Sequence, residues 1–102
     1  MAKVIALYKK PADAAAFDKY YFSTHVPIAK AVPGLRKYEV STGTVAAGQG
    51  DSGLHLVAVL TFDSVSAIQA GLETPEGKAV GADLGNFAQA GVDLLIFDTK
   101  EV

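Results

Sequence analysis

The hydrophobic positions along the chain predict four strands and two helical regions. Residues 3–8 are almost continuously apolar and predict a first strand, which ends before Lys9-Lys10-Pro11. Residues 35–41 alternate around Tyr38 and Val40, as expected of a strand with one buried face. Two longer apolar runs, residues 54–62 and 92–98, predict the remaining strands.

Helix starts are marked by capping residues. Asp13 precedes three alanines and predicts the start of the first helical region, and Ser64 predicts the start of the second. Thr74-Pro75-Glu76 is a further start signal, because proline suits the first helical position and an acid suits the first turn. The core-facing residues of the second region are then Val65, Ile68, Leu72, Val80, Leu84, Phe87 and Ala88.

The first helical region carries a stripe of aromatic residues that ends in a histidine. Phe17, Tyr20, Tyr21, His25 and Ile28 have the spacing that places side chains on one face of a helix. A stripe that served packing alone would end in an aliphatic residue. This one ends in an imidazole, which exchanges protons near neutral pH.

Three local features modify this pattern. Pro27 lacks a backbone donor and disfavours helical geometry before it, so a break or kink is predicted around His25, with a short continuation to Ala31. Residues 43–53 are small and glycine-rich and predict a long, mobile hairpin loop without ordered chemistry. Glycines at four-residue spacing should weaken the last helix or let a ligand approach its backbone: Gly77, Gly81 and Gly85.

The order βαββαβ predicts an α+β, ferredoxin-like fold, a four-stranded antiparallel sheet with its helices on one face. The strands are apolar at both parities, so both faces of the sheet need cover. A chain of 102 residues has no further element for the second face. A second copy can cover it, and a homodimer with the sheets packed face to face is predicted.

The composition limits the number of domains and the kinds of partner and location that are expected. With half of its 102 residues hydrophobic, the chain suits one domain spanning residues 1–102. The net charge is −2 and the basic residues are scattered, which argues against nucleic acid as a partner. Without cysteine there is no thiol nucleophile, and a cytoplasmic location is expected. The short apolar start predicts neither a signal peptide nor membrane association.

Several stretches resemble the EthD family. They are Val4-Ile5-Ala6-Leu7-Tyr8-Lys9-Lys10-Pro11, Phe17-Asp18-Lys19-Tyr20-Tyr21, Thr24-His25-Val26-Pro27-Ile28-Ala29 and Pro33-Gly34-Leu35. The later Leu60-Thr61-Phe62-Asp63-Ser64 is similar to the wider dimeric α+β barrel superfamily. The resemblance implies a homodimeric barrel with a cavity for a small apolar organic compound. It also implies a link to ethyl tert-butyl ether degradation beside a cytochrome-type monooxygenase system, and it carries His25 over from the family motif.

The candidate catalytic residues are His25, Tyr21 and Tyr38, which the topology should gather in the cavity. His55 begins its strand at the other end of the sheet and should be exposed or at the dimer contact. Two distant histidines do not make a metal site, and the sequence requires no cofactor.

Two classes of function fit these residues. In the first, an enzyme of a catabolic pathway, His25 is a general acid or base for a small carbonyl, lactone or phenolic compound, and a tyrosine stabilises negative charge. In the second, a non-catalytic accessory or carrier protein holds an apolar compound for a monooxygenase system. A purely structural His25, bonded to free carbonyls, is the alternative to both, and the tyrosines would then be core aromatics.

Overall fold

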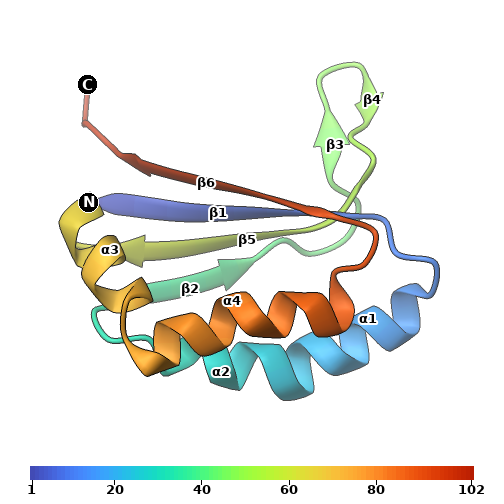
Figure 1. Ribbon diagram of the computed structural model, residues 1–102. Coiled ribbons are helices and arrows are strands. Elements are labelled where there is room, and N and C mark those ends of the chain that lie inside the picture. Colours follow the sequence, from blue (N-terminus) through green and yellow to red (C-terminus); the bar gives the residue numbers. More distant parts are fainter.

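Four strands form one antiparallel sheet in the order β2-β5-β1-β6 in the computed structural model, which describes residues 1–102 (Figure 1). In chain order the elements are β1 (Ala2–Lys9), α1 (Ala14–Tyr20), η1 (Tyr21–His25), α2 (Val26–Lys30), β2 (Lys37–Val40), β3 (Ala46–Ala47), β4 (Gly50–Asp51), β5 (Leu54–Phe62), α3 (Val65–Leu72), α4 (Pro75–Phe87) and β6 (Val92–Asp98). Two βαβ halves interlock in this order, which confirms the predicted ferredoxin-like α+β fold.

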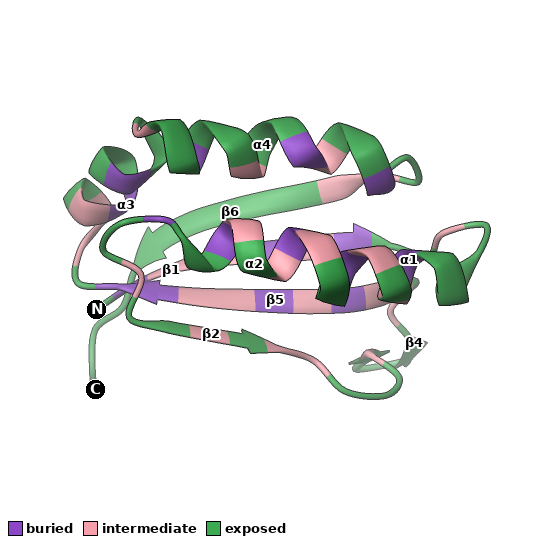
Figure 2. Ribbon diagram, turned by 90° about the horizontal axis from the view of Figure 1, so that it is seen from below, coloured by how far each residue is buried: buried purple, intermediate pink, exposed green.

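The helices lie together on one face of the sheet (Figures 1 and 2). Small residues of the central strands, Ala6 opposite Ala58, let the helices pack close to the sheet. Larger side chains complete the main core cluster: Tyr8, Phe17, Tyr21, Leu56 and Phe87. Burying each of these large side chains contributes on the order of 2 kcal/mol of hydrophobic stabilisation.

The first helical region continues past His25 and does not break there. Asp13 caps its start, with Oδ1 accepting from the amide of Ala16 at 3.0 Å. The turn η1 is a π-helix in which the amide of Val26 donates to the carbonyl of Tyr21, five residues earlier. Pro27 lies in the first turn of α2. The irregularity predicted around His25 is therefore a widened turn and not a break, because this turn accommodates the missing donor while the backbone stays helical, and the short continuation ends at Lys30 with Ala31 as its cap.

In the second helical region, α4 packs closely against α3 at Gly77. Ser64 and Thr74 cap α3 and α4 as predicted, accepting from the amides of Ala67 and Gly77 at 3.0 and 3.1 Å. Gly77 is buried, and a Cβ there would collide with the backbone of Gly71 and Leu72. The glycines leave α4 a regular helix of 13 residues, and the first of them sets its close approach to α3.

The predicted hairpin loop contains a small ladder of its own. β3 and β4 pair antiparallel, and the hairpin projects from the body of the molecule (Figure 1). Lys10 Nζ and Asp51 Oδ2, 2.5 Å apart, connect the hairpin to the end of β1. The structure is therefore more ordered than the glycine-rich composition indicates.

The face of the sheet away from the helices is largely apolar. It carries Ile5, Leu7, Val57, Val59, Leu95 and Phe97, and the same parity adds Lys3, Lys37, Glu39, Thr61 and Asp93. No helix covers it, and Leu95 and Phe97 on the edge strand are 49% and 42% exposed. This confirms that the strands are apolar on both faces. None of the helices has the length and apolar character needed to span a membrane.

Candidate functional site

A cavity of about 320 Å³ lies between the helices and the sheet. Of its 19 lining residues 15 are hydrophobic, three tyrosines included, and the lining comes from all four strands of the sheet, from α3 and α4 and from the first helical region. The polar side chains that reach it are His25, Lys78 and three tyrosines, Tyr8, Tyr21 and Tyr38. Such a site suits a small, mostly apolar molecule with few polar atoms.

His25 is bonded to a buried carboxylate. Its Nδ1 lies 2.8 Å from Oδ2 of Asp83 on α4, and the two residues are 2% and 5% exposed. Since a carboxylate only accepts, Nδ1 carries the hydrogen of this bond. Nε2 makes no hydrogen bond within the protein. Since every fully buried polar side-chain atom has a partner, Nε2 is not fully buried. Nε2 is therefore the nitrogen available to a ligand in the cavity.

Two more side chains hold the carboxylate of Asp83. Tyr20 donates its hydroxyl to Oδ1 at 2.5 Å, and Asn86 donates its amide to the same oxygen at 3.0 Å. Burial disfavours the charged form, but the hydrogen bonds from Tyr20, Asn86 and His25 outweigh it and hold the pKa of Asp83 below its usual range. Asp83 is thus a fixed negative charge behind the imidazole.

The π-turn positions both His25 and Tyr21 toward the interior. Tyr21 is fully buried, and its hydroxyl oxygen lies 2.6 Å from that of Tyr38 on β2. The ring centroids of Tyr21 and His25 are 5.4 Å apart, and the ring centroid of Phe87 on α4 lies 4.6 Å from that of His25. Aromatic contacts therefore fix the orientation of the imidazole in addition to its hydrogen bond.

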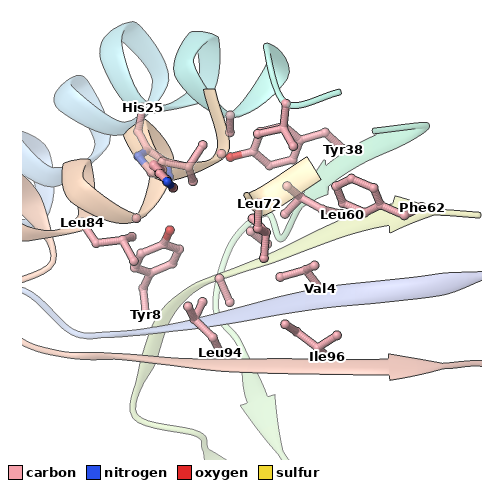
Figure 3. A pocket seen from close by; sticks show the side chains of 18 of the residues that line it. Val4, Tyr8, His25, Tyr38, Leu60, Phe62, Leu72, Leu84, Leu94 and Ile96 are labelled. Carbon is pink, nitrogen blue, oxygen red and sulfur yellow. The ribbon is translucent and has the colours of Figure 1, made fainter. Parts of the chain in front are cut away.

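The tyrosine hydroxyls of the cavity stay protonated over a wide pH range. Burial raises the pKa of Tyr8, Tyr21 and Tyr38 above the usual value, and the hydrogen bond to Tyr38 raises the pKa of Tyr21 further. In Figure 3 the hydroxyls of Tyr8 and Tyr38 point toward the part of the cavity where His25 lies. These groups are donors or neutral acceptors at physiological pH.

The structure brings all three predicted site residues, His25, Tyr21 and Tyr38, to the same cavity. His55 lies elsewhere, as its strand position indicates. It is neither exposed nor on the outer face: it packs against Phe17, and its Nε2 lies 2.7 Å from Asp18. The expected exposure of His55 is therefore wrong, because a register shift near the end of β1 alters the pairing there, and its place at the dimer contact stays a prediction.

Sequence reasoning missed Asp83 and Tyr8. Asp83 falls within the apolar stripe of α4, between Val80 and Phe87, where a carboxylate needs a partner. Tyr8 shares the parity of Val4 and Ala6, which face the helices. Both signals were present in the sequence. No group of three or more His, Asp or Glu side chains is placed to hold a metal ion.

Comparison with known proteins adds close relatives. The model of the EthD domain matches residues 9–91. An uncharacterised 11.0 kDa protein of Rhodococcus erythropolis, from the thcB-thcC intergenic region, is 35% identical over 108 residues, which cover 100% of this chain and 98% of that protein. The crystal structure of an EthD family protein from Bacillus halodurans has a TM-score of 0.89 at 37% identity, covering 98% of this chain and 99% of that one.

More distant structures share the fold alone. A dimeric ferredoxin-like protein of unknown function from Thermobifida fusca has a TM-score of 0.67 at 19% identity, covering 96% of this chain and 90% of that one. SnoaB, a cofactor-independent oxygenase from Streptomyces nogalater, has a TM-score of 0.68 at 14% identity, covering 99% and 94%. The fold therefore occurs in dimers and in an enzyme that works without a cofactor.

Proposed function

The chain belongs to the EthD family, and on that premise we propose that it binds a small apolar organic compound in its cavity, where His25 transfers a proton without a resident cofactor. The observation that carries this proposal is the bond between His25 Nδ1 and Asp83 at 2.8 Å, which leaves Nε2 to a largely apolar cavity. A purely structural histidine gains nothing from a second nitrogen that is left open to a cavity.

The pair supplies acid–base chemistry through its geometry. Asp83 fixes the tautomer of His25, so that Nε2 holds a lone pair and accepts a proton from a bound ligand. The imidazolium formed in this way faces an ionised carboxylate, which stabilises its charge. The proton then returns to another atom of the ligand. A positioned acid–base group of this kind contributes about 10²–10⁴-fold to a rate.

The active form in this proposal is a homodimer. The apolar outer face of the sheet is open in the single chain, and the fold occurs in proteins described as dimeric. Packing two such faces together removes several hundred Å² of apolar surface from water, at about 25 cal/mol per Å².

A carrier function is the second candidate, favoured by the mostly hydrophobic wall of the cavity. In this case the protein holds an apolar compound for a partner monooxygenase system, and His25 orients the ligand without transferring a proton. Ethyl tert-butyl ether, the compound in the family's name, suits this role better than the enzymatic one, since an ether has no readily ionised hydrogen.

Ligand binding and stability measured on the same variants test these proposals. Native mass spectrometry of the purified protein against a panel of small apolar compounds identifies a ligand. His25→Asn, which keeps a donor near Asp83, should abolish proton transfer with a small loss of thermal stability, and Ser66→Ala, at an exposed position of α3, is the control. A large fall in melting temperature with unchanged ligand affinity would identify His25 as a structural residue. Weaker ligand affinity of His25→Asn at unchanged stability, with no turnover in the native protein, would favour the carrier.

A further inference from the structure

Three tyrosine hydroxyls line the cavity near His25, each supplied by a different element. Tyr8 comes from β1, Tyr21 from η1 and Tyr38 from β2. The Tyr21 and Tyr38 oxygens are 2.6 Å apart, and the ring centroids of Tyr8 and Tyr21 are 5.5 Å apart. Figure 3 shows the hydroxyls of Tyr8 and Tyr38 turned toward the side of the cavity that holds the imidazole. We name these three residues the tyrosine cluster.

Counting hydrogens shows what the cluster offers to a ligand. Three hydroxyls carry three hydrogens, and the contact between Tyr21 and Tyr38 uses one of them. Two O–H groups therefore remain for a group in the cavity. Burial keeps these hydroxyls protonated, so the cluster donates while Nε2 of His25 accepts. A donor and a base thus face one apolar space from different walls.

The charged side chains in and near the cavity favour a ligand without charge. Lys78 is the one cationic side chain in the lining, and it is exposed. The only carboxylate near the imidazole, Asp83, has its oxygens occupied by Tyr20, Asn86 and His25. A neutral molecule with one acceptor oxygen and an acidic hydrogen beside it satisfies both the base and the donor.

We propose that the substrate is an enolisable carbonyl compound, whose oxygen is held by the tyrosine cluster while Nε2 of His25 removes a proton from the adjacent carbon. This proposal rests on the proposed function. The C–H bond breaks and its hydrogen passes to Nε2 as a proton, its electron pair forms the new C=C bond, and the π pair of the C=O bond moves to the oxygen, giving an enolate. The imidazolium then returns the proton to the same carbon or to a conjugated one, so no oxidant is needed.

The location of the donors explains why the oxygen would carry the charge. Hydrogen bonds aimed at an oxyanion stabilise the enolate more than the ketone, which lowers the barrier. Tyr8 and Tyr38 would contact the oxygen, and Tyr21 would position Tyr38 through their 2.6 Å contact. Tyr8 then gains a role that its position in a strand core does not indicate.

Three bicyclic probes test the proposal. 2-Tetralone has acidic hydrogens beside its carbonyl, 2-naphthol has the shape of its enolate, and naphthalene lacks the oxygen. We expect the native protein to bind 2-naphthol about 10-fold or more tightly than naphthalene, and to speed His25-dependent deuterium exchange of 2-tetralone. Tyr8→Phe combined with Tyr38→Phe should bring the affinity ratio near one, leave naphthalene binding unchanged and slow exchange on the order of 100-fold. Ser66→Ala should match the native protein.

Each negative result would contradict a different part of the proposals. Exchange that depends on His25 but is unchanged in the double tyrosine variant overturns the tyrosine cluster and leaves the proposed function intact. Exchange that is unchanged in His25→Asn overturns the proposed function itself. Equal affinity of the native protein for 2-naphthol and naphthalene, with no exchange of 2-tetralone, overturns the enolisable substrate. Melting temperatures of all variants show whether each comparison is made between folded proteins.

Discussion

His25 and Asp83, 58 residues apart in the chain, form a 2.8 Å hydrogen bond between η1 and α4 in the protein interior. The bond joins the two helical regions above the sheet. It also sets which imidazole nitrogen faces the cavity, so one contact affects both packing and chemistry.

Replacing Asp83 by Asn should change how stability depends on acid. Because the pKa of Asp83 is lowered in the folded protein, its contribution is present above the unfolded value of about 3.9 and is lost as pH falls through the lower folded value. Asp83→Asn should therefore lower stability at pH 7 by about 1–3 kcal/mol and flatten the acid limb. Urea unfolding between pH 2.5 and 7 measures both effects. An equally steep acid limb in the variant would contradict the lowered pKa.

The tyrosines should resist ionisation in the folded protein. All four have a raised pKa, three through burial and Tyr20 first through its bond to Asp83. Ionisation then favours the unfolded chain, so stability should be complete below about pH 10 and fall above it. Absorbance at 295 nm should show little tyrosinate at pH 10.5 until the protein unfolds. Tyr21→Phe should weaken the alkaline loss, and full tyrosinate in the folded state would refute the assignment.

Two glycines of α4 should respond to alanine with opposite signs. A Cβ at Gly77 collides with the backbone of α3, so Gly77→Ala should destabilise by about 1–3 kcal/mol. A Cβ at Gly85 meets nothing within 4 Å, so Gly85→Ala should stabilise by about 0.5–1 kcal/mol through helix propensity. Thermal and urea unfolding of the pair decide this. The same sign for both would mean that close packing does not explain Gly77.

A charge on the outer face of the sheet should dissociate the proposed homodimer. Val57 lies in the centre of this face on β5, so Val57→Glu would place a carboxylate in the contact. Gly48→Glu on the projecting hairpin is the control, since that position has open space around it. Sedimentation at micromolar concentration should give about twice 10.6 kDa for the native protein and the control, and monomer for Val57→Glu. A native monomer would reject the face-to-face dimer.

The fold could be predicted because its signals are local. Caps at Asp13, Ser64 and Thr74 and the parity of the strands determine where elements begin and which side they bury. Their order then leaves few topologies. The predicted strand over residues 35–41 was too long only at its ends, since β2 covers Lys37–Val40.

The site could be predicted only in part, because its decisive contact is not local. The stripe that led to His25 and Tyr21 is a short-range pattern, and Tyr38 followed from topology. The partner Asp83 lies 58 residues away, and the pairing depends on how α4 packs against η1. The π-turn was missed for another reason: Pro27 predicts only that a hydrogen bond is lost, and either a break or a wider turn satisfies that loss.

The π-turn also sets the direction of the side chains that follow it in the helix. A π-turn behaves like an α-helix with one residue inserted, so every side chain after it is rotated by about 100° relative to an uninterrupted helix. Removing Ser23, an exposed residue of η1, would let the segment close into ordinary α-helix. The missing residue and the narrower turn would offset each other, so the imidazole would still face Asp83, whereas an ordinary α-helical turn that kept Ser23 would rotate it away. The direction of the His25 side chain thus depends on the number of residues in the helix and on its winding, as well as on its composition.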